Sequence, residues 1–193
     1  MKILFATGNL NKATEIQRVL PKEIEIITLK DIALKEDIPE TSDTIRGNAL
    51  QKVNYIKLNF NIDCFSDDTG LEIRALKGAP GVYSARYAGD QRNDEDNMDL
   101  VLKKLKSYTD RSARFKTIIA LELNGTVHEF EGIVNGTILS EKRGKKGFGY
   151  DPIFEPENCG KSFAEMNMDE KNKYSHRARA TAKMIRFLTK NIL

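Results

Sequence analysis

The start of the chain constrains the fold most strongly, because a strand pattern, a polar break and a helix pattern follow one another there. Residues 2–6 are mostly apolar and predict a buried strand. Thr7-Gly8-Asn9 breaks this run, and from Asn11 apolar residues recur at helical spacing until Pro21. Residues 24–29 then alternate like a second strand. The order strand, helix, strand predicts an α/β fold.

Helical and extended patterns continue along the rest of the chain. Helical spacing predicts helices at 44–59 and at 93–108, and Ser175 is expected to cap a last helix. A short strand is predicted at 63–66. We expect Asp67-Asp68-Thr69-Gly70 to interrupt this strand before the chain continues extended.

A β-hairpin is predicted in the second half of the chain. Residues 114–123 and 126–134 are rich in strand-forming residues, and Asn124-Gly125 between them is a strong hairpin signal. A parallel opening followed by a hairpin predicts a mixed sheet. We therefore expect residues 1–193 to form a single domain, with two lobes and a substrate cleft between them.

Composition and segment lengths narrow the cellular setting. Of 193 residues, 40 % are hydrophobic and 31 % charged, as in soluble globular proteins. No apolar run is long enough for a membrane span, and the start is too short and polar for a secretory signal. Cys64 and Cys159 form no CxxC pair, so neither zinc nor redox chemistry is indicated. We expect a cytoplasmic protein without a membrane partner, with Cys64 in a buried strand.

The net charge favours an enzyme that binds an anion. A formal charge of +3 is too small for a protein that coats nucleic acid, so no nucleic-acid partner is expected. A small excess of cations does suit a local positive site for a charged substrate.

The first candidate site is the turn Thr7-Gly8-Asn9-Leu10-Asn11-Lys12 between the first strand and helix. Backbone N–H groups at a helix start can bind phosphate, and Gly8 allows close approach. Lys12 lies where the helix dipole disfavours a cation, which a bound phosphate would reverse. The spacing is not that of a P-loop. An ordinary turn with a solvated Lys12 is the alternative.

The second candidate site is the acidic pair Asp67-Asp68. Side chains alternate along a strand, so the two carboxylates should point in opposite directions, one toward a ligand. Mg²⁺ binds a few carboxylates together with substrate phosphate oxygens, and Glu40 could supply another carboxylate. An Asp-rich turn without a ligand is the alternative.

Two later segments carry aromatic and basic groups. In Gly147–Pro152 the flanking glycines expose Phe148, on which a base could stack; a structural anchor is the alternative. In Lys171–Arg177 cations are expected to crowd a helix N-terminus, where Lys171 and Arg177 could donate to a purine carbonyl. A solvated basic start with a structural His176 is the alternative.

These segments together resemble the Ham1 family of non-canonical purine nucleoside-triphosphate pyrophosphatases. Six collinear stretches carry the resemblance: ATGNLNK at 6–12, IPET at 38–41, FSDDTGLEI at 65–73, GAPGVYSARYAG at 78–89, GFGYDPIF at 147–154, and 171–177 ending in SHR. One departure is visible: many members have Glu-Asn-Ala where this chain has Gly47-Asn48-Ala49.

The resemblance implies a fold and a set of site residues. The fold would be an elongated α/β structure of two lobes around a long mixed sheet, usually a homodimer. Asp68 would be the catalytic carboxylate and, with Glu40, a Mg²⁺ ligand. Substrate would contact Thr7, Gly8, Asn9, Leu10, Asn11, Lys12, Thr69, Phe148, Gly149, Tyr150, Asp151, Lys171, His176 and Arg177, with Asp67, Lys52 and Arg86 as further candidates.

The implied reaction is a Mg²⁺-dependent house-cleaning hydrolysis of ITP, dITP or XTP to the monophosphate and pyrophosphate. Lys171 and Arg177 can only donate hydrogen bonds, so they would bind the 6-oxo acceptor of ITP or XTP and reject the 6-amino donor of ATP. GTP also carries a 6-oxo group, so this selectivity does not exclude it. Two alternatives stay open from the residues. One is a Maf-type pyrimidine nucleotide pyrophosphatase, and the other is a nucleotide- or nucleic-acid-binding protein without turnover.

Overall fold

The computed structural model describes residues 1–34, 36 and 38–191, and its N-terminal segment forms the predicted strand, helix and strand. These elements are β1 (Lys2–Phe5), α1 (Leu10–Gln17) and β2 (Glu25–Ile27). Asn9 caps α1, because its side chain accepts hydrogen bonds from two first-turn amides. The helix ends before Pro21, as the missing N–H of proline predicts.

The chain divides into two compact units. The first contains Met1–Asp68, Thr117–Gly132 and Arg177–Leu193, and the second contains Thr69–Lys116 and Ile133–His176. Within the first unit the strand order is β2-β1-β3-β5-β6, and β1 pairs in parallel with both β2 and β3. The mixed sheet of the α/β prediction is thereby confirmed, since other pairs are antiparallel.

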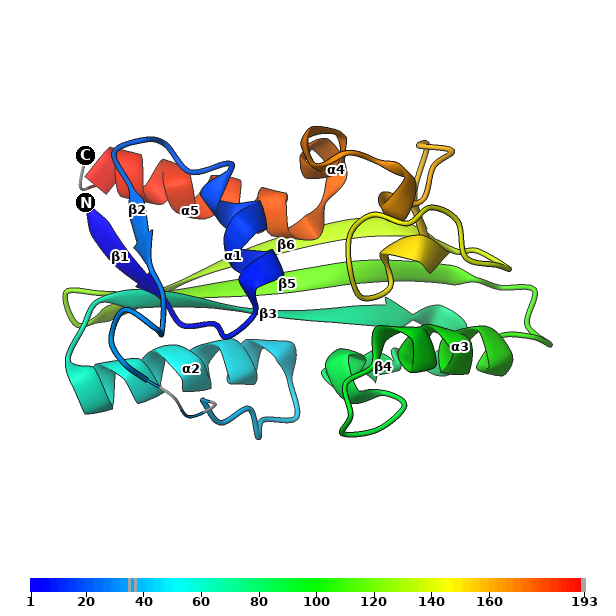
Figure 1. Cartoon of the computed structure of the whole chain (residues 1–193), viewed down its shortest axis with the longest axis horizontal. Helices are drawn as coiled ribbons and strands as arrows, with labels where there is room; N and C mark the ends of the chain where they lie inside the picture. Colours follow the sequence, from blue (N-terminus) through cyan, green and yellow to red (C-terminus); the bar gives the residue numbers. More distant parts are fainter. Residues whose placement is uncertain (35, 37, 192–193) are drawn as a thin grey trace. The chain divides into compact units, whose positions relative to one another are not determined.

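Helices cover both faces of β3 in the first unit (Figure 1). Helices α1 and α5 (His176–Asn191) share a buried core with Phe65, whereas α2 (Ile45–Phe60) contacts the neighbouring residues of β3. There Cys64 Sγ lies 3.8 Å from Val53 O, and Ser66 Oγ donates to Ala49 O at 2.6 Å. Alternate residues of β3 therefore face different helices.

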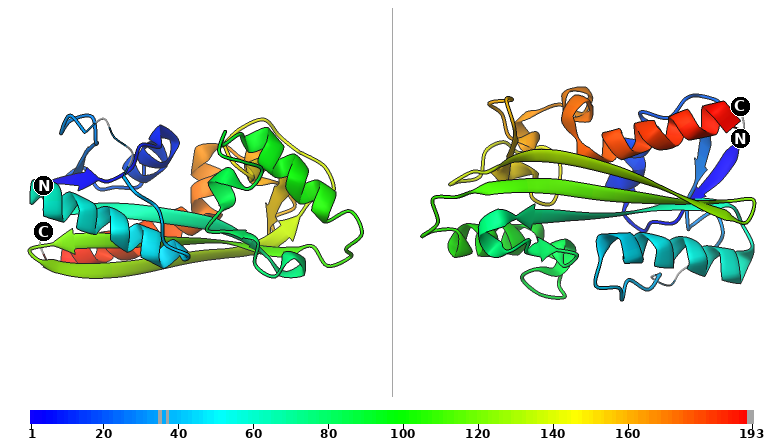
Figure 2. Two further views of the ribbon diagram at one scale, coloured as in Figure 1. Left: turned by 90° about the horizontal axis from the view of Figure 1, so that it is seen from below. Right: turned by 180° about the vertical axis from the view of Figure 1, so that it is seen from behind.

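The predicted hairpin is formed by β5 (Ser112–Leu123) and β6 (Thr126–Ile138). Asn124 and Gly125 have φ of 50° and 81°, the left-handed values that a two-residue hairpin turn needs. Helix α5 lies along this end of the hairpin (Figure 2), where the rings of Phe187 and His128 are 4.2 Å apart.

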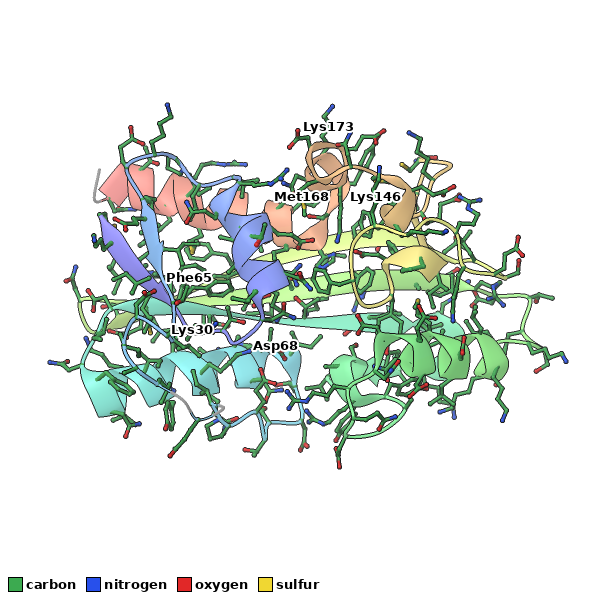
Figure 3. All side chains as sticks on the ribbon, in the orientation of Figure 1. Lys30, Phe65, Asp68, Lys146, Met168 and Lys173 are labelled. Carbon is green, nitrogen blue, oxygen red and sulfur yellow. The ribbon has the colours of Figure 1, made fainter. Side chains whose placement is uncertain are left out.

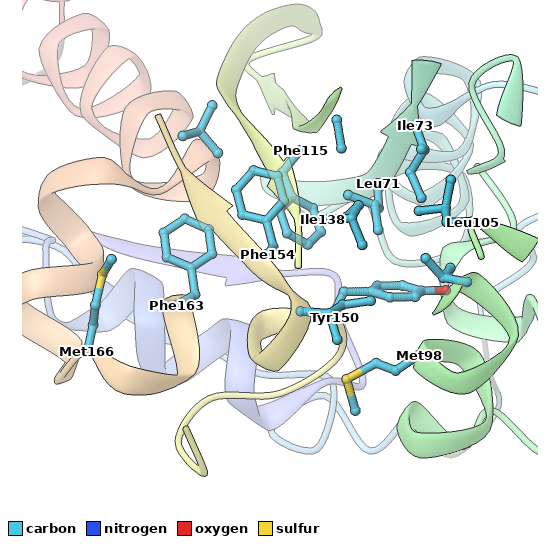
Figure 4. Close-up of a cluster of buried hydrophobic side chains, with 14 residues drawn as sticks. Leu71, Ile73, Met98, Leu105, Phe115, Ile138, Tyr150, Phe154, Phe163 and Met166 are labelled. Atoms are coloured by element: carbon cyan, nitrogen blue, oxygen red, sulfur yellow. The ribbon is translucent and has the colours of Figure 1, made fainter. Parts of the chain in front are cut away.

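The second unit has its own core of aliphatic and aromatic side chains (Figure 4). The rings of Phe115 and Phe154 meet edge to face at 4.7 Å, and Tyr150 is buried beside them. The elements of this unit include β4 (Pro80–Gly81), α3 (Asp94–Lys104), β7 (Phe154–Pro156), α4 (Met168–Tyr174) and the 3-10 turns η1 (Arg74–Leu76), η2 (Ser84–Arg86), η3 (Asp151–Ile153) and η4 (Phe163–Glu165).

The predicted interruption of the third strand is wrong. Strand β3 runs without a break over Cys64–Ile73, and Asp67-Asp68-Thr69-Gly70 lies inside it. Asp and Gly normally favour turns, but here Lys12 pairs with the buried Asp67 and Lys52 lies near Asp68, so the extended backbone is retained. Cys64 is fully buried in this strand, as predicted.

No helix in residues 1–34, 36 and 38–191 is long and apolar enough to cross a membrane. The single domain over residues 1–193 stays a prediction.

Candidate active site

Asp67 and Asp68 face opposite sides of β3, as alternation along a strand predicts. Asp67 lies on the side of α1 and α5: Lys12 Nζ is 3.0 Å from its Oδ1, and Arg177 Nε is 3.1 Å from its Oδ2. Asp68 lies on the side of α2 (Figure 3), where Asn48 Nδ2 is 3.4 Å from its Oδ2. Adjacent residues thus have separate environments.

Asp67 is the centre of a buried ion-pair network. Burial alone would raise its pKa, but Lys12, Arg177 and Lys52 together hold the pKa of this carboxyl well below its usual range. Arg177 also donates through Nη1 to the buried carboxylate of Glu15 on α1. The network joins β3 to two helices and keeps Asp67 ionised.

Asp68 has weaker contacts and a different acidity. Lys52 Nζ lies 3.9 Å from its Oδ1, beyond ordinary hydrogen-bond distance. Burial raises the pKa of Asp68 to about 6; Glu40 and Asp67 add to this, while Lys52 and Lys12 oppose it. Such a carboxylate is ionised at neutral pH and basic enough to accept a proton, which are the properties of a general base.

Lys52 connects the two acidic residues that were predicted to hold metal. Its Nζ donates to Glu40 Oε1 at 2.5 Å and to the Asp67 carbonyl at 2.7 Å. Burial alone would lower the pKa of Lys52, but the carboxylates of Asp68, Glu40 and Asp67 raise it, so the ammonium form is stable. Its positive charge in turn lowers the pKa of Glu40 against the effect of burial.

The acidic residues suit a Mg²⁺ ion that is brought by a phosphate. No group of three or more His, Cys, Asp or Glu residues able to hold a metal is found in the part of the chain that the structure describes. Mg²⁺ needs only one or two carboxylates when substrate phosphates supply other oxygens. Asp68 and Glu40 both approach Lys52, so they are the two carboxylates that could hold such an ion.

The turn before α1 leaves space for an anion at Gly8. A Cβ at this position would meet nothing within 4 Å. Asn9 Oδ1 accepts from the amides of Asn11 and Lys12 at 2.9 and 3.3 Å, so the cap itself engages these two predicted phosphate donors. Burial lowers the pKa of Lys12, partly balanced by Asp67.

In the second unit, Asp151 organises the segment that was predicted to hold a base. Its Oδ2 accepts from Phe148 N at 2.9 Å and from Lys171 Nζ at 2.6 Å. The Lys171 ammonium lies 4.9 Å from the centre of the Phe148 ring. Gly147 is required, because its φ is 76° and a Cβ would lie 2.0 Å from Asp151 Oδ2.

Two contacts from elsewhere in the second unit hold the same loop. Gly149 N donates to Asp94 Oδ2 at 2.7 Å, at the start of α3. The Tyr150 hydroxyl donates to Ser84 O at 2.7 Å, and burial raises the pKa of this phenol. The backbone beside Phe148 is therefore fixed from two directions.

The predicted basic helix start at 171–177 needs correction. Lys171 and Lys173 lie in the last turn of α4, where the helix dipole favours cations, and only Arg177 lies in the first turn of α5. The chain forms two helices here, α4 and α5. Ser175 at the C-cap of α4 has an extended backbone, which separates them.

The structure assigns the predicted purine-reading residues to different units. Lys171 pairs with Asp151 in the second unit, whereas Arg177 belongs to the network of Asp67 in the first. His176 is buried with its ring 4.6 Å from that of Phe115.

Of the remaining candidates, Thr69 follows Asp68 on β3 and is partly buried. The Arg86 guanidinium lies 5.3 Å from the centre of the Tyr83 ring, in the second unit.

Three site residues were missed from the sequence: Glu15, Asn48 and Asp94. Asn48 could have been found, because it falls with the predicted Lys52 on the inward face of α2 among Ala49, Val53 and Ile56. A polar residue at such a position usually has a buried partner. Glu15 and Asp94 carry no comparable signal, since their partners lie far away in sequence.

Comparison with known proteins decides the family. The model of the Ham1 family matches residues 3–187, almost the entire chain. The chain belongs to the Ham1 family. The solved Ham1 protein of Staphylococcus aureus superposes with a TM-score of 0.90 at 35 % identity, covering 98 % of this chain and 99 % of that one. The HAM1 protein of Coxiella burnetii gives a TM-score of 0.91 at 37 % identity over the same shares.

Curated Ham1 relatives are similar over the same length. The dITP/XTP pyrophosphatase of Christiangramia forsetii is 55 % identical over 98 % of this chain and 100 % of the relative. That of Flavobacterium psychrophilum is 52 % identical over 97 % and 98 %. This Ham1 chain is therefore an enzyme, a pyrophosphatase, and the non-catalytic and Maf-type alternatives are set aside.

Proposed function

We propose that this enzyme uses Mg²⁺ to hydrolyse non-canonical purine nucleoside triphosphates (ITP, dITP and XTP) to the monophosphate and pyrophosphate. The reaction removes these nucleotides from the nucleotide pool. The observation that carries the proposal is the contrast between Asp67, which is neutralised by Lys12 and Arg177, and Asp68, whose pKa is raised to about 6. One carboxylate is structural, and the other is prepared for chemistry.

Charge balance supports Mg²⁺ as the cofactor. The cluster around Asp67 and Asp68 contains three cations and four carboxylates: Lys12, Lys52, Arg177, Glu15, Glu40, Asp67 and Asp68. Such a cluster has no excess of positive charge with which to hold a polyanion. A divalent cation held by Asp68 and Glu40 would supply that charge and polarise the phosphoryl group.

In the proposed reaction a water molecule attacks the α-phosphorus, and the bond to the oxygen that bridges the α- and β-phosphorus breaks. Asp68 orients this water and accepts its proton. Pyrophosphate leaves with the bridging oxygen, and its charge is stabilised by Lys12 and Lys52. The proton then passes from Asp68 to solvent. Asp67 keeps Lys12 in place through their 3.0 Å contact.

The group around Phe148 is proposed to bind the purine. The partly buried Phe148 ring offers a stacking surface, and Lys171 beside it can donate to a 6-oxo group. An ammonium has three N–H donors, so a purine carbonyl can bind alongside Asp151. ATP would present an amino donor to the same cation, which disfavours it. Arg177 is given a supporting role, because its guanidinium binds Asp67 and Glu15.

The decisive experiment measures pyrophosphate release from ITP, dITP, XTP, GTP and ATP, with Mg²⁺ and with a chelator. We expect rapid release from the first three, slow release from ATP, and a loss of activity with the chelator. Equal rates for ATP and dITP would contradict the base assignment, and full activity with the chelator would contradict the metal assignment. A cytoplasmic location and a homodimer are part of the same proposal, the latter testable by light scattering.

A further inference from the structure

The segment Gly47-Asn48-Ala49, in the first turn of α2, contains a buried amide with two partners. Asn48 is 1 % exposed on α2. Its Oδ1 accepts from Ser42 N at 2.9 Å, and its Nδ2 lies 3.4 Å from Asp68 Oδ2. One side chain thus contacts Asp68, the proposed base, and the turn that carries Glu40 (residues 40–42).

The same turn is fastened to α2 by a second amide. Gln51 Oε1 accepts from Thr41 N, and its Nε2 donates to Thr41 Oγ1, both at 2.9 Å. Ser42 N is bound to Asn48 as well, so both residues that follow Glu40 are held against α2. The Glu40 carboxylate then faces Lys52. The position of Glu40 is therefore set by the side chains of α2.

Gly47 makes this arrangement possible. A Cβ at Gly47 would lie 1.8 Å from Ser42 Oγ and 2.7 Å from Ser42 Cβ. Any larger residue would push Ser42 away from α2 and weaken its bond to Asn48. The glycine thus lets Ser42 dock against the helix.

We infer that Asn48 is a positioning residue that couples Asp68 to the turn carrying Glu40. The inference rests on the proposed function, in which these two carboxylates act together. The two ends of the amide have separate tasks: the carbonyl oxygen holds the turn, and the amino group orients Asp68. Groups that orient such ligands typically change activity about 10–100-fold when they are removed.

Two substitutions separate the two tasks. Asn48→Ala removes both contacts, whereas Asn48→Asp keeps an oxygen acceptor for Ser42 N and loses the donor to Asp68. Ser66→Ala is the control, because Ser66 Oγ joins the same strand to the same helix through Ala49 O without contacting the turn. The control reports the effect of loosened packing alone.

The measurements are kcat and KM for dITP, together with hydrogen exchange of the Ser42 amide by NMR. We expect both Asn48 variants to lower kcat about 10–100-fold with little change in KM. Ser42 exchange should become faster in Asn48→Ala and stay slow in Asn48→Asp. Ser66→Ala should keep the wild-type kcat and slow exchange.

Wild-type kcat in both Asn48 variants, or an equal loss in Ser66→Ala, would overturn the inference. Unchanged Ser42 exchange in Asn48→Ala would overturn it as well. The failure of the proposed function looks different, because the wild-type enzyme would then release no pyrophosphate. In that case the exchange measurements would still test the link between Asn48 and the turn.

Discussion

Lys12 lies 3.0 Å from Asp67 Oδ1, so the cation predicted to bind phosphate is held by the residue adjacent to the proposed base. Arg177 binds the other oxygen of the same carboxylate. Asp67 therefore acts as an anchor for two cations, and Asp68 on the opposite side of the strand is kept apart from them.

Asp67→Asn should destabilise the protein by about 3–5 kcal/mol, because it leaves buried cations without their shared carboxylate. Urea denaturation monitored by circular dichroism measures the change. Glu25→Gln is the control: it breaks the Lys2–Glu25 pair, whose side chains are 67 % and 64 % exposed, and should have little effect. Equal effects of the two substitutions would show that Asp67 is not an anchor.

Asp68→Asn should abolish turnover and yet stabilise the metal-free protein at pH 8. The folded-state pKa of about 6 lies above the ordinary 3.8, so the wild type loses stability as the pH rises between these values. The loss amounts to about 3 kcal/mol and persists above pH 6. The variant carries no charge at residue 68, so its free energy of unfolding should not show this decline with pH.

Denaturation midpoints of the wild type and Asp68→Asn at pH 4 to 8, in the presence of a chelator, test this stability prediction. The difference between the two proteins should vanish toward pH 4. A wild type that becomes more stable between pH 4 and 6 relative to the variant would reverse the sign and disprove the raised pKa. Near-wild-type pyrophosphate release by the variant would remove Asp68 from its proposed role.

Gly47→Ala should lower kcat and stability, because the new Cβ would overlap Ser42 Oγ and Cβ. Overpacking of this kind costs about 1–3 kcal/mol. Ser42→Gly in the same chain removes both overlapping atoms and should restore part of both losses. A double-mutant cycle on kcat and on urea midpoints gives the coupling, and additive effects would contradict the proposed contact.

Asp94→Ala should raise KM for dITP about tenfold, because Gly149 N loses its acceptor and the loop beside Phe148 is released. Asp94→Asn keeps an oxygen acceptor and should stay near the wild type. Steady-state kinetics compares them. If both variants raised KM equally, the charge of Asp94 rather than its hydrogen bond to Gly149 would matter.

Local patterns were sufficient for most elements of the fold. Asn9, Thr44 and Asn93 cap the predicted helices, and Asn124-Gly125 forms the predicted hairpin turn. Such signals depend on backbone preferences over a few residues, which the sequence contains directly. The break predicted at Asp67–Gly70 was wrong, because distant cations outweighed the local preference for a turn.

The sequence by itself determined the α/β class, the family and the opposite directions of Asp67 and Asp68, since alternation along a strand is a local property. Only the tertiary structure decided the partners: Arg177 with Asp67 and Glu15, Lys52 with Glu40, Asn48 with Asp68. These contacts join residues from separate helices, strands and turns. The acidity of Asp68 follows from that arrangement, because burial and nearby charges set a pKa.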